Sequence, residues 1–394
     1  MNVDEIKEIT LFCEQGDSAK ISTWSNVPYF LAKTLEERGI KLNRVNLNPG
    51  SNRFHKAFYK LWNVFAKGVF RNKYYTYRRS GIYYFLIERR IRKALRQFPN
   101  ADLCLFTTYN FSSSDFSAKP VLLFNDWTAD YNARHFKGID PATLPYHQRK
   151  FIKRQAHCIE TADAVVSLFP GMAADMARVY KNKNINYVGN VVNSLYEADP
   201  ASIEEKKKGC DILFVGKKHY LKGAHELLEA FARLREVRPE ARLHIIGMKA
   251  KKLGTLPEGA VCYGYLDKGN PQACETYYEL MRKCRLFINT TPKWGAFSAS
   301  VEAMYHYMPV IITPYSEFVN TFGNEIDFGV YHSETAGADA LSREMLEMLD
   351  NRNFESMANA AHAAVADFKW DIFVGNMLKT LERKSRFAYI GSTS

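Results

Sequence analysis

Short apolar runs alternate with helical stretches along nearly the whole chain, and this alternation constrains the fold more than any other feature of the sequence. In the first half, runs of apolar and β-branched residues predict buried strands at 9–13, 45–47, 103–106, 121–124, 164–168 and 188–192. The second half repeats the scheme at 212–215, 243–246, 261–263, 286–289 and 310–313. Strands that are apolar on both faces and separated by helices belong to parallel sheets covered on both sides. We therefore predict an α/β fold of two doubly wound, Rossmann-like domains.

The predicted helices and the chain length give the domain organisation. Helical spacing is found at 29–38, 147–161, 226–237, 273–283, 299–307, 341–349, 355–364 and 372–384. The 394 residues suit two cores better than one. We place one domain at 1–190 and another at 191–370, with a last helix in 371–394 that crosses back to the first. Since ligands bind beyond the carboxyl ends of parallel strands, we expect a cleft where the strand ends of the two domains face each other.

Composition excludes several classes of protein. With 46% hydrophobic and 24% charged residues the chain is predicted to be globular. No apolar run reaches the roughly 18 residues of a membrane span, and the first residues, MNVDEIKEIT, lack the apolar stretch of a signal peptide. The seven cysteines are scattered, without a CxxC or a Cys/His cluster. We therefore expect a reduced, cytoplasmic protein that needs neither a metal nor a cofactor.

The net charge of +12 is concentrated in residues 53–96. This segment contains 13 Lys and Arg, a single acid (Glu88) and 12 aromatic residues, so the rest of the chain is neutral on balance. A basic helix with aromatic anchors is typical of proteins that lie on an anionic membrane. Basic and aromatic residues also occur together on nucleic-acid-binding surfaces, and a solvated helical hairpin with its aromatics packed on the domain is a third interpretation. We favour a peripheral membrane surface on the inner face and expect no nucleic acid.

The segment 292–314, PKWGAFSASVEAMYHYMPVIITP, predicts a glycine turn at Gly295, a helix that carries Glu302, and a buried strand. Unpaired backbone N–H groups and the helix dipole make such a turn an anion site. One acid on the first turns of the helix, with no metal-ligating cluster nearby, suits the hydroxyls of a ribose better than a phosphate. Turn and acid together predict a site for a nucleoside diphosphate.

Lysines follow another predicted strand of the second half. Gly216 and Lys217 come directly after the strand at 212–215, and Lys222 lies shortly before a helix. Lysines placed there can neutralise a diphosphate leaving group. A solvated loop rich in lysine is the alternative.

Two further strand ends carry candidate residues. Tyr265 and Leu266 follow the strand at 261–263, where backbone groups could read the edge of a base. Asp126 follows the strand at 121–124 and should project into the cleft. An aspartate at a strand end can also be a helix cap or a turn residue.

Several blocks of the sequence resemble, in order and spacing, the retaining glycosyltransferases of family 4, which have the GT-B fold. The strongest likeness covers 211–313, where ILFVGKKHYLKGAHELLEAFARLREVRPEARLHIIG, VCYGYLDK and GAFSASVEAMYHYMPVI look like the nucleotide-sugar domain. Upstream, TWSNVPYFLAKTLEERG resembles the first loop and helix of one branch of that family. FNDWTADY, with the helical block after it, resembles the mid-domain motif, and VGNVVN resembles the hinge.

The resemblance implies roles for individual residues. Lys217 and Lys222 would hold the donor diphosphate, and Glu302 would bind the ribose hydroxyls. Asp126 would occupy the place where many members carry a histidine near the anomeric carbon. The other donor contacts would be Gly216, Tyr265 and Leu266 around the base, and Gly295, Ala296 and Phe297, whose amides face phosphate or sugar. On the acceptor side we expect Trp24, Ser25 and Trp127.

Two positions depart from the pattern of the family. The glutamate usually found eight residues before Glu302, which contacts the donor sugar, is Trp294 here, and we expect this ring to pack against the sugar or the acceptor. The usual arginine of the phosphate pair is Lys217, a point charge in place of a planar fork. These departures leave the donor sugar open.

The expected activity is transfer of a sugar from a UDP- or GDP-type donor to a hydroxyl of a glycan or lipid-linked acceptor. The resemblance implies retention of anomeric configuration, no metal, and a place in bacterial-type polysaccharide or glycolipid assembly. One alternative is a sugar-nucleotide epimerase on the same fold, which would need carboxylates at both ends of the cleft. The other is a non-catalytic scaffold or binding protein. Trp294 argues against the epimerase and in favour of the scaffold.

Overall fold

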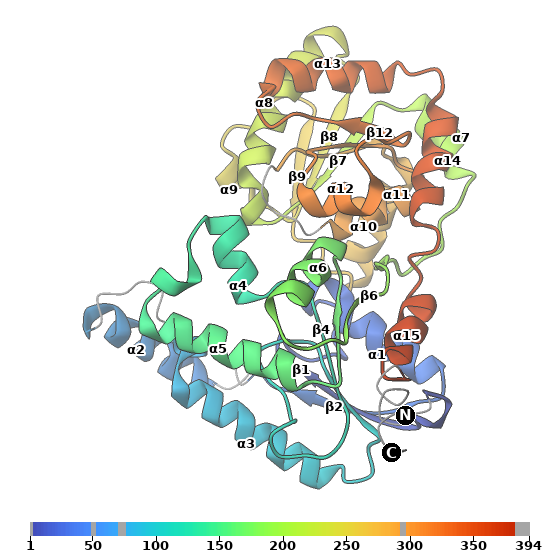
Figure 1. Cartoon of the computed structure of the whole chain (residues 1–394). Coiled ribbons are helices and arrows are strands. Elements are labelled where there is room, and N and C mark those ends of the chain that lie inside the picture. Colours follow the sequence, from blue (N-terminus) through green and yellow to red (C-terminus); the bar gives the residue numbers. More distant parts are fainter. Residues whose placement is uncertain (1–2, 49–52, 70–75, 292–296, 383–394) are drawn as a thin grey trace. The chain divides into compact units, whose positions relative to one another are not determined.

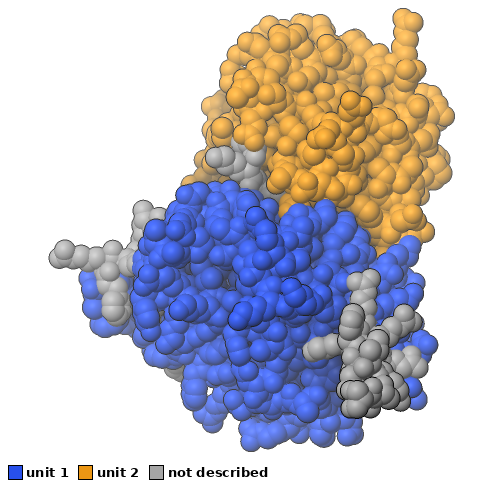
Figure 2. Space-filling view, in the orientation of Figure 1, with its two compact units in different colours: residues 1–190, 370–394 blue, residues 191–369 orange. Residues whose placement is uncertain are grey.

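The computed structural model describes residues 3–48, 53–69, 76–291 and 297–382 (Figure 1). The chain forms two compact units (Figure 2): unit 1 comprises residues 1–190 and 370–394, and unit 2 comprises residues 191–369. Each unit is built on one parallel sheet of six strands. The predicted α/β class with two parallel sheets is therefore confirmed.

The sheet of unit 1 has the strand order β2-β1-β3-β4-β5-β6. Its inner strands are buried on both faces, and Phe12 of β1 stacks on Phe106 of β3 with ring centroids 4.4 Å apart. Burial on both sides explains why these strands are continuous apolar runs in the sequence. The strands are β1 Glu8–Cys13, β2 Lys41–Asn46, β3 Leu103–Phe106, β4 Val121–Asn125, β5 Ala164–Ser167 and β6 Ile185–Tyr187.

Helices connect the successive strands of unit 1 except β3 and β4, between which the structure has a loop, and α15 follows at the end of the chain. Among them, α3 begins at a hydrogen-bonded cap, in which the hydroxyl of Ser80 accepts from the backbone N–H of Tyr83. The helices are α1 Val27–Glu37, α2 Arg53–Val69, α3 Gly81–Gln97, α4 Ala129–Tyr131, α5 Tyr146–Thr161, α6 Pro170–Val179 and α15 Trp370–Lys379.

The sheet of unit 2 has the order β12-β11-β10-β7-β8-β9. Its core joins the central strands to α8 and α13, with Phe214, Phe231 and Leu341 among the fully buried side chains. The strands are β7 Asp211–Val215, β8 Arg242–Ile246, β9 Ala260–Gly264, β10 Leu286–Asn289, β11 Val310–Ile312 and β12 Gly329–Tyr331. The helices are α7 Ser202–Lys208, α8 Leu221–Val237, α9 Ala250–Leu253, α10 Pro271–Lys283, α11 Ser298–Tyr305, α12 Ser316–Phe322, α13 Gly337–Leu349 and α14 Phe354–Val365.

Helix α15 follows unit 2 in the sequence but packs within unit 1. The ring of Trp370 stacks on Phe30 of α1, with centroids 6.3 Å apart. Arg38, at the end of α1, donates to the carboxylate of Asp371 over 2.7 Å and to the backbone carbonyl of the same residue. Phe373 is buried against Phe124 of β4. The polar contacts and the aromatic contacts thus fix the first turn of this helix to unit 1.

The bounds of β2, which covers Lys41–Asn46 and not 45–47, are shifted, and the structure departs further from the sequence predictions at two other strands. The last strand of unit 1 is Ile185–Tyr187, not 188–192. Val191 and Val192 are buried, and Val192 hydrogen-bonds through its backbone to Phe368, so their apolar character reflects burial without sheet pairing. The edge strand β12 was not predicted because its three residues are only half buried. Gly329 is required there, since a Cβ would lie 2.1 Å from the carbonyl oxygen of Val310.

Candidate functional site

Glycines bring two loops of unit 2 into backbone contact at the carboxyl edge of its sheet. The backbone N–H of Gly216, after β7, donates to Ile246 at the end of β8 over 2.9 Å. Gly247 has a φ of +94°, and a Cβ there would lie 2.6 Å from the carbonyl oxygen of Gly216. A Cβ on Gly216 itself would lie 2.9 Å from the ring of Phe214. Only glycine fits at 216, and this close fit fixes the position from which Lys217 extends.

The predicted donor residues Lys217 and Tyr265 lie together. The Lys217 ammonium is 5.1 Å from the centroid of the Tyr265 ring, and both side chains are exposed. This is cation–π distance, and it places a free positive charge beside an accessible aromatic face. Leu266, the next residue, is half-buried. The ends of β7 and β9 therefore present a cation and a ring to the same ligand space.

Lys222 lies on the first turn of α8, because this helix begins at Leu221 and not at the predicted position 226. Its side chain is exposed. The next residue, Gly223, packs so closely on the end of β10 that a Cβ would lie 2.8 Å from the hydroxyl of Thr291. The hydroxyl of Thr290 also donates to the carbonyl oxygen of Gly223 over 3.1 Å. The start of α8 is thus held against the residues that lead into 292–296.

Three of the predicted donor residues, Trp294, Gly295 and Ala296, lie outside the described residues. Phe297 is described, and while the predicted role of its backbone amide stays a prediction, its side chain is a core residue. It is fully buried, with its ring 5.5 Å from Phe318 and 6.1 Å from Tyr315. The ring anchors the start of α11, and only the backbone of Phe297 is left to offer to a ligand.

Glu302 of α11 is buried in a polar cluster that the sequence analysis did not foresee. The Lys268 ammonium is 2.5 Å from one carboxylate oxygen, and the two side chains are only 7% and 5% exposed. The Tyr278 hydroxyl donates to the same oxygen over 3.0 Å, and that of Tyr277 donates to the other oxygen over 2.9 Å. Burial raises the pKa of both tyrosines, and the negative charge of the nearby carboxylate adds a smaller effect in the same direction. The charge of Glu302 is therefore balanced by Lys268 and by two donated hydrogen bonds.

The same cluster holds the segment that enters unit 2. Lys268 donates to the backbone carbonyl of Asn193 over 3.1 Å, and Leu195 donates its backbone N–H to the Tyr278 hydroxyl over 2.8 Å. Ser194 hydrogen-bonds to His306 at 2.9 Å. Burial, and then the positive charge of Lys206 and Lys268, lowers the pKa of His306 to about 3, so this histidine is neutral throughout the physiological range.

A pocket of about 990 Å³ opens in unit 2 beside this cluster. Lys268, Tyr278 and His306 form part of its wall, while the Glu302 carboxylate lies behind them. The signal that could have identified Lys268 was present in the sequence, because it ends the block VCYGYLDK. Its pairing with Glu302, 34 residues away, could not be read from spacing.

In unit 1, Asp126 directly follows β4 and is half-buried. Its carboxylate accepts the backbone N–H of Trp127 over 2.8 Å. Burial raises the pKa of Asp126 to about 6, although hydrogen bonds from the Trp127 backbone and the Trp24 side chain act in the opposite direction. A carboxyl group that titrates near neutral pH is a candidate for acid–base or charge-stabilising chemistry.

The loop after β1 brings Trp24 to Asp126 through strained backbone. Trp24, Ser25 and Asn26 have φ values of 36°, 53° and 71°. Non-glycine residues in this region cost roughly 1–2 kcal/mol each, and strain of this kind concentrates at functional sites. Trp24 also packs on Phe124 of β4, with centroids 6.0 Å apart. The two predicted acceptor residues Trp24 and Ser25 therefore lie at the same sheet edge as Asp126.

Trp127, the third predicted acceptor residue, belongs to an aromatic stack. Its ring stacks on Phe169 with centroids 4.6 Å apart and on Tyr131 at 5.4 Å, and Phe136 meets it edge-on. The side chain is half-buried. The stack fixes the indole, so part of a rigid aromatic surface remains accessible next to Asp126.

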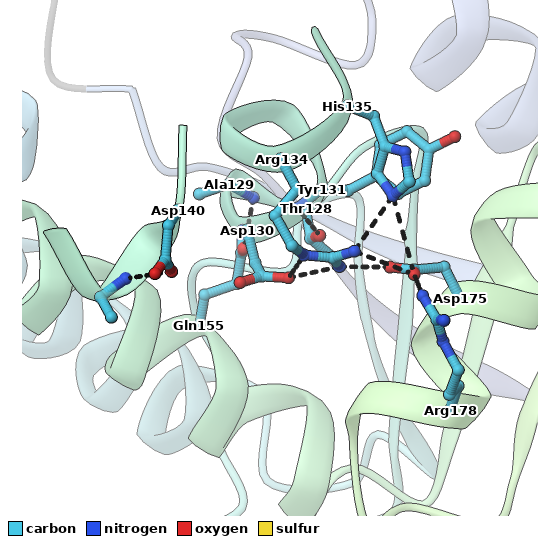
Figure 3. A network of polar contacts seen from close by, with 11 residues as sticks. Thr128, Ala129, Asp130, Tyr131, Arg134, His135, Asp140, Gln155, Asp175 and Arg178 are labelled. Atoms are coloured by element: carbon cyan, nitrogen blue, oxygen red, sulfur yellow. Dashed lines mark hydrogen bonds and ion pairs between the residues drawn. The ribbon is translucent and has the colours of Figure 1, made fainter. Parts of the chain in front are cut away.

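An ionic network holds the segment that carries this stack (Figure 3). Arg134 is 2.5 Å from Asp130 and 2.6 Å from Asp175 of α6, and Arg178 is 2.7 Å from Asp175. Burial alone would raise the pKa of Asp175, but hydrogen bonds from Arg134 and Arg178 outweigh it and hold that pKa below its usual value. The network is structural and orders the backbone that follows Trp127.

A second carboxylate, Glu14, was missed by the sequence analysis. It follows β1 and accepts hydrogen bonds from the Thr108 hydroxyl at 2.5 Å and the Asn110 amide at 2.8 Å. Gln155 links Asn110 to the backbone N–H of Ala129. This chain of contacts crosses the ends of β1, β3 and β4 and stiffens the edge that carries Asp126. Within the described ranges, no group of three or more His, Cys, Asp or Glu side chains is arranged to hold a metal ion.

Comparisons with known proteins can be set beside this geometry. Residues 196–365 match the family model described as glycosyl transferases group 1. A search of curated proteins gave no match. Among solved structures, sucrose-phosphate synthase from Thermosynechococcus elongatus is 14% identical, with 98% of this chain and 100% of that chain covered and a TM-score of 0.65.

Two further solved structures resemble this chain to a similar degree. HepE from Anabaena, in complex with UDP and glucose, is 13% identical, with 96% of this chain and 99% of that chain covered and a TM-score of 0.60. WaaG, a glycosyltransferase involved in lipopolysaccharide biosynthesis, is 15% identical, with 97% and 99% covered and a TM-score of 0.60. Identities this low establish the fold alone. The chain has the GT-B fold. Its second unit carries a glycosyl transferases group 1 domain.

Proposed function

We propose that this chain transfers a glycosyl group from a nucleoside diphosphate sugar to a hydroxyl of a glycan or lipid-linked acceptor. One observation carries the proposal: the segment that matches the glycosyl transferases group 1 family also holds Lys217, Lys222 and Glu302, the first two exposed at the carboxyl edge of its sheet. The complex of HepE with UDP and glucose supports a UDP-type donor here, with a GDP-type donor as the alternative. Polysaccharide or glycolipid assembly in a bacterial-type cytoplasm is the setting we propose.

The donor diphosphate is proposed to bind between the lysines and the start of α11. Lys217 and Lys222 supply two positive charges at the edge of the sheet. The N-terminus of α11 adds backbone N–H groups and the positive end of the helix dipole. The exposed ring of Tyr265, already beside Lys217, offers a flat surface for the base. These groups stabilise a diphosphate without a metal ion, which is the metal-independent route that we propose.

Glu302 is proposed to bind the ribose. A carboxylate offers about four lone-pair sites, and Lys268, Tyr277 and Tyr278 occupy three of them. A ribose hydroxyl takes the remaining site, or replaces Tyr278 as donor. The Lys268 ammonium pairs with this carboxylate in a buried place, and we propose that Glu302 accepts a charge-assisted hydrogen bond from the ligand.

Departure of the diphosphate is the difficult step of the transfer. The bond between the anomeric carbon and the phosphate oxygen breaks, and negative charge grows on the diphosphate, where Lys217, Lys222 and the dipole of α11 stabilise it. The acceptor oxygen then bonds to the anomeric carbon on the same face, which retains the configuration. The acceptor proton passes to the departing phosphate oxygen, so no strong side-chain base is needed.

Unit 1 is proposed to supply the acceptor contacts and one charged group. Trp24, Ser25 and Trp127 offer aromatic and hydroxyl surface of the kind that binds sugar rings. Asp126, whose pKa is raised to about 6, is ionised in most molecules above that pH. We assign it to stabilisation of positive charge at the anomeric carbon, in the place where many members of family 4 carry a histidine.

Turnover of a panel of UDP-, GDP- and ADP-sugars, with and without glycan or lipid-linked acceptors, tests this proposal. We expect release of one nucleoside diphosphate from one class of donor, with product of retained configuration, and loss of release in Lys217→Ala/Lys222→Ala. Lys251→Ala/Lys252→Ala, on α9, is the matched control and should behave as wild type. Donor binding without release from any donor would favour the non-catalytic scaffold. Conversion of the sugar without release of nucleotide would favour the epimerase.

A further inference from the structure

One side of helix α2 exposes a row of large apolar side chains. Lining this face are side chains that are 45–72% exposed, although each is a large hydrophobic residue: Phe58 45%, Leu61 70%, Val64 72%, Phe65 55% and Val69 58%. Scattered exposed hydrophobic residues are ordinary on a protein surface, but a contiguous set marks a contact site. At 3.6 residues per turn, Leu61, Val64 and Phe65 fall in one sector of the helix.

Aromatic residues on the inner side of α2, with Phe58 at the border of the exposed sector, explain how the helix is fixed. Trp62, Phe58 and Tyr59 pack around the buried ring of Tyr77, with centroids 6.2, 5.5 and 6.1 Å from it. The backbone N–H of Tyr77 also donates to the side-chain carbonyl of Asn63 over 3.2 Å. The interpretation of the segment as a hairpin packed on its domain therefore holds for these four aromatic residues. It leaves the outward sector of α2 unexplained.

The start of α3 adds a second apolar group, followed by cations. Ile82, Phe85 and Leu86 are 45%, 61% and 39% exposed on its first turns. Arg89 and Lys93 continue the same face, one turn and two turns further along, and both are exposed. On α2, the exposed Lys56 and Lys60 lie along one border of the apolar sector. No ion pair joins a described Lys or Arg of residues 53–96 to a described acid.

The surface combines aliphatic side chains with cations that have no ion-pair partner among the described residues. This combination indicates which of the possible partners it binds. Nucleic acid binds through phosphates and through bases stacked on aromatic rings, and it gains little from Leu61, Val64 or Val69. Tyr77 and Tyr83 are buried, and although the rings of Phe58, Phe65 and Phe85 are exposed, the other five exposed apolar residues of α2 and α3 are aliphatic and cannot stack on a base. A bilayer with anionic headgroups matches both features, because hydrocarbon accepts the aliphatic groups while the headgroups attract the lysines and arginines.

We propose that the outward face of α2 with the first turns of α3, referred to below as the α2–α3 face, binds the surface of an anionic lipid bilayer. The apolar residues insert to the depth of the acyl-chain boundary, and Lys56, Lys60, Arg89 and Lys93 contact phosphate headgroups. In the part of the chain that the structure describes, no helix has the length and hydropathy of a membrane span. In this proposal the α2–α3 face lies on the bilayer surface. Binding of lipid does not depend on the proposed transferase activity.

The α2–α3 face is connected to the candidate acceptor residues within unit 1. Tyr77 packs on Tyr83 of α3 with centroids 5.4 Å apart, and Tyr83 and Tyr84 reach Phe111 at 6.2 and 5.3 Å. Phe111 follows the carboxyl end of β3, at the sheet edge where Asp126 follows β4. A bilayer at the α2–α3 face therefore brings headgroups toward that edge, which suits the lipid-linked class of acceptor.

Sedimentation of the full chain with lipid vesicles tests the proposal. We expect binding to phosphatidylcholine vesicles that contain phosphatidylglycerol, much weaker binding to pure phosphatidylcholine, and release at high salt. Lys56→Glu/Lys60→Glu should weaken binding at least about 30-fold, since each basic residue contributes about fivefold at such a surface. Lys251→Glu/Lys252→Glu on α9 makes the same change of charge elsewhere and should bind as wild type.

The apolar contribution has its own matched pair of variants. Val64→Ser, at a residue 72% exposed, should weaken vesicle binding about tenfold. Val237→Ser, at a residue 63% exposed at the end of α8 in unit 2, should have no effect. Equal losses in both members of either pair, or equal binding to neutral and anionic vesicles, would overturn the proposal. So would tighter binding to single-stranded RNA, or a dimer in solution that dissociates in Val64→Ser. Release of nucleotide from the donor sugar, measured without vesicles, reports separately on the proposed function.

Discussion

Asp126→Asn should change the stability of the protein in a way that depends on pH. The carboxyl group has a pKa of about 6 in the folded chain against 3.8 in the unfolded chain, so the folded state disfavours its ionised form. The cost is absent below pH 3.8, grows between pH 3.8 and 6, and is complete above pH 6. This difference in pKa lowers the free energy of unfolding by at most about 3 kcal/mol. The amide has a similar shape and no charge, and the variant should therefore be more stable than wild type by up to about 3 kcal/mol at pH 7.5. The gain should be below about 1 kcal/mol at pH 4.

Asp175→Asn is the matched comparison, because the pKa of Asp175 is held below its usual value. The ionised form is favoured in the folded state, and that stability is present above pH 3.8 and lost as the pH falls through the folded pKa. Loss of hydrogen bonds to charged groups should destabilise this variant by roughly 2 kcal/mol at pH 7.5. The same substitution is thus expected to have opposite signs at the two positions.

Urea unfolding followed by tryptophan fluorescence measures both effects. Four of the five tryptophans, at 24, 62, 127 and 370, belong to unit 1, so the signal reports mainly on the unit that contains both aspartates. An Asp126→Asn effect that is the same at pH 4 and pH 7.5, or a loss of stability at pH 7.5, would refute the reasoning. The variant should also transfer sugar poorly. Higher stability together with lower activity would show that Asp126 serves the reaction and not the stability of the fold.

Four further predictions concern the donor residues and Lys268, the partner of Glu302. Lys217→Ala and Lys222→Ala should each lower kcat more than they raise the donor KM, because the leaving charge is greatest in the transition state; steady-state kinetics would contradict this if the whole effect were in KM. Glu302→Gln should lower the affinity for nucleoside diphosphate by about 10- to 150-fold in calorimetric titration. Lys268→Met should destabilise unit 2 by about 3–5 kcal/mol, and Lys268→Met/Glu302→Gln should recover most of that loss; independent, additive effects in thermal unfolding would argue against the buried pair. Trp294→Glu should alter the preference among nucleotide sugars, and an unchanged preference would show that this ring does not contact the donor.

Fully buried parallel strands were the most predictable part of the fold. The bounds of β3 and β10 agree with the sequence analysis because both strands are apolar on both faces and paired on both sides. The edge strand β12 carries only three half-buried residues, and so short a segment gives no periodic signal. Val191 and Val192 misled the prediction of β6, since a buried apolar run does not reveal whether its backbone is paired in a sheet.

The candidate site was predictable as a set of strand ends but not as a set of contacts. Lys217, Tyr265 and Asp126 could be placed because each follows a recognisable strand. The buried pairing of Lys268 with Glu302 depends on packing between α10, α11 and the loop after β9, which no local pattern encodes. The left-handed backbone at Trp24, Ser25 and Asn26 could not be predicted either, because glycine is the usual sequence signal for this conformation and the segment contains none.

The placement of α15 has a consequence for how the chain is made. During synthesis, residues 1–190 emerge first but lack the helix that covers Phe30 and Phe124, whereas residues 191–369 emerge as one uninterrupted compact unit. Unit 2 can complete its core on the ribosome, and unit 1 must wait for Trp370 and Phe373. Until then the apolar surface around α1 is open to solvent and to chaperones. A chain that ends just after residue 369 would therefore have an intact second unit attached to an incomplete first one.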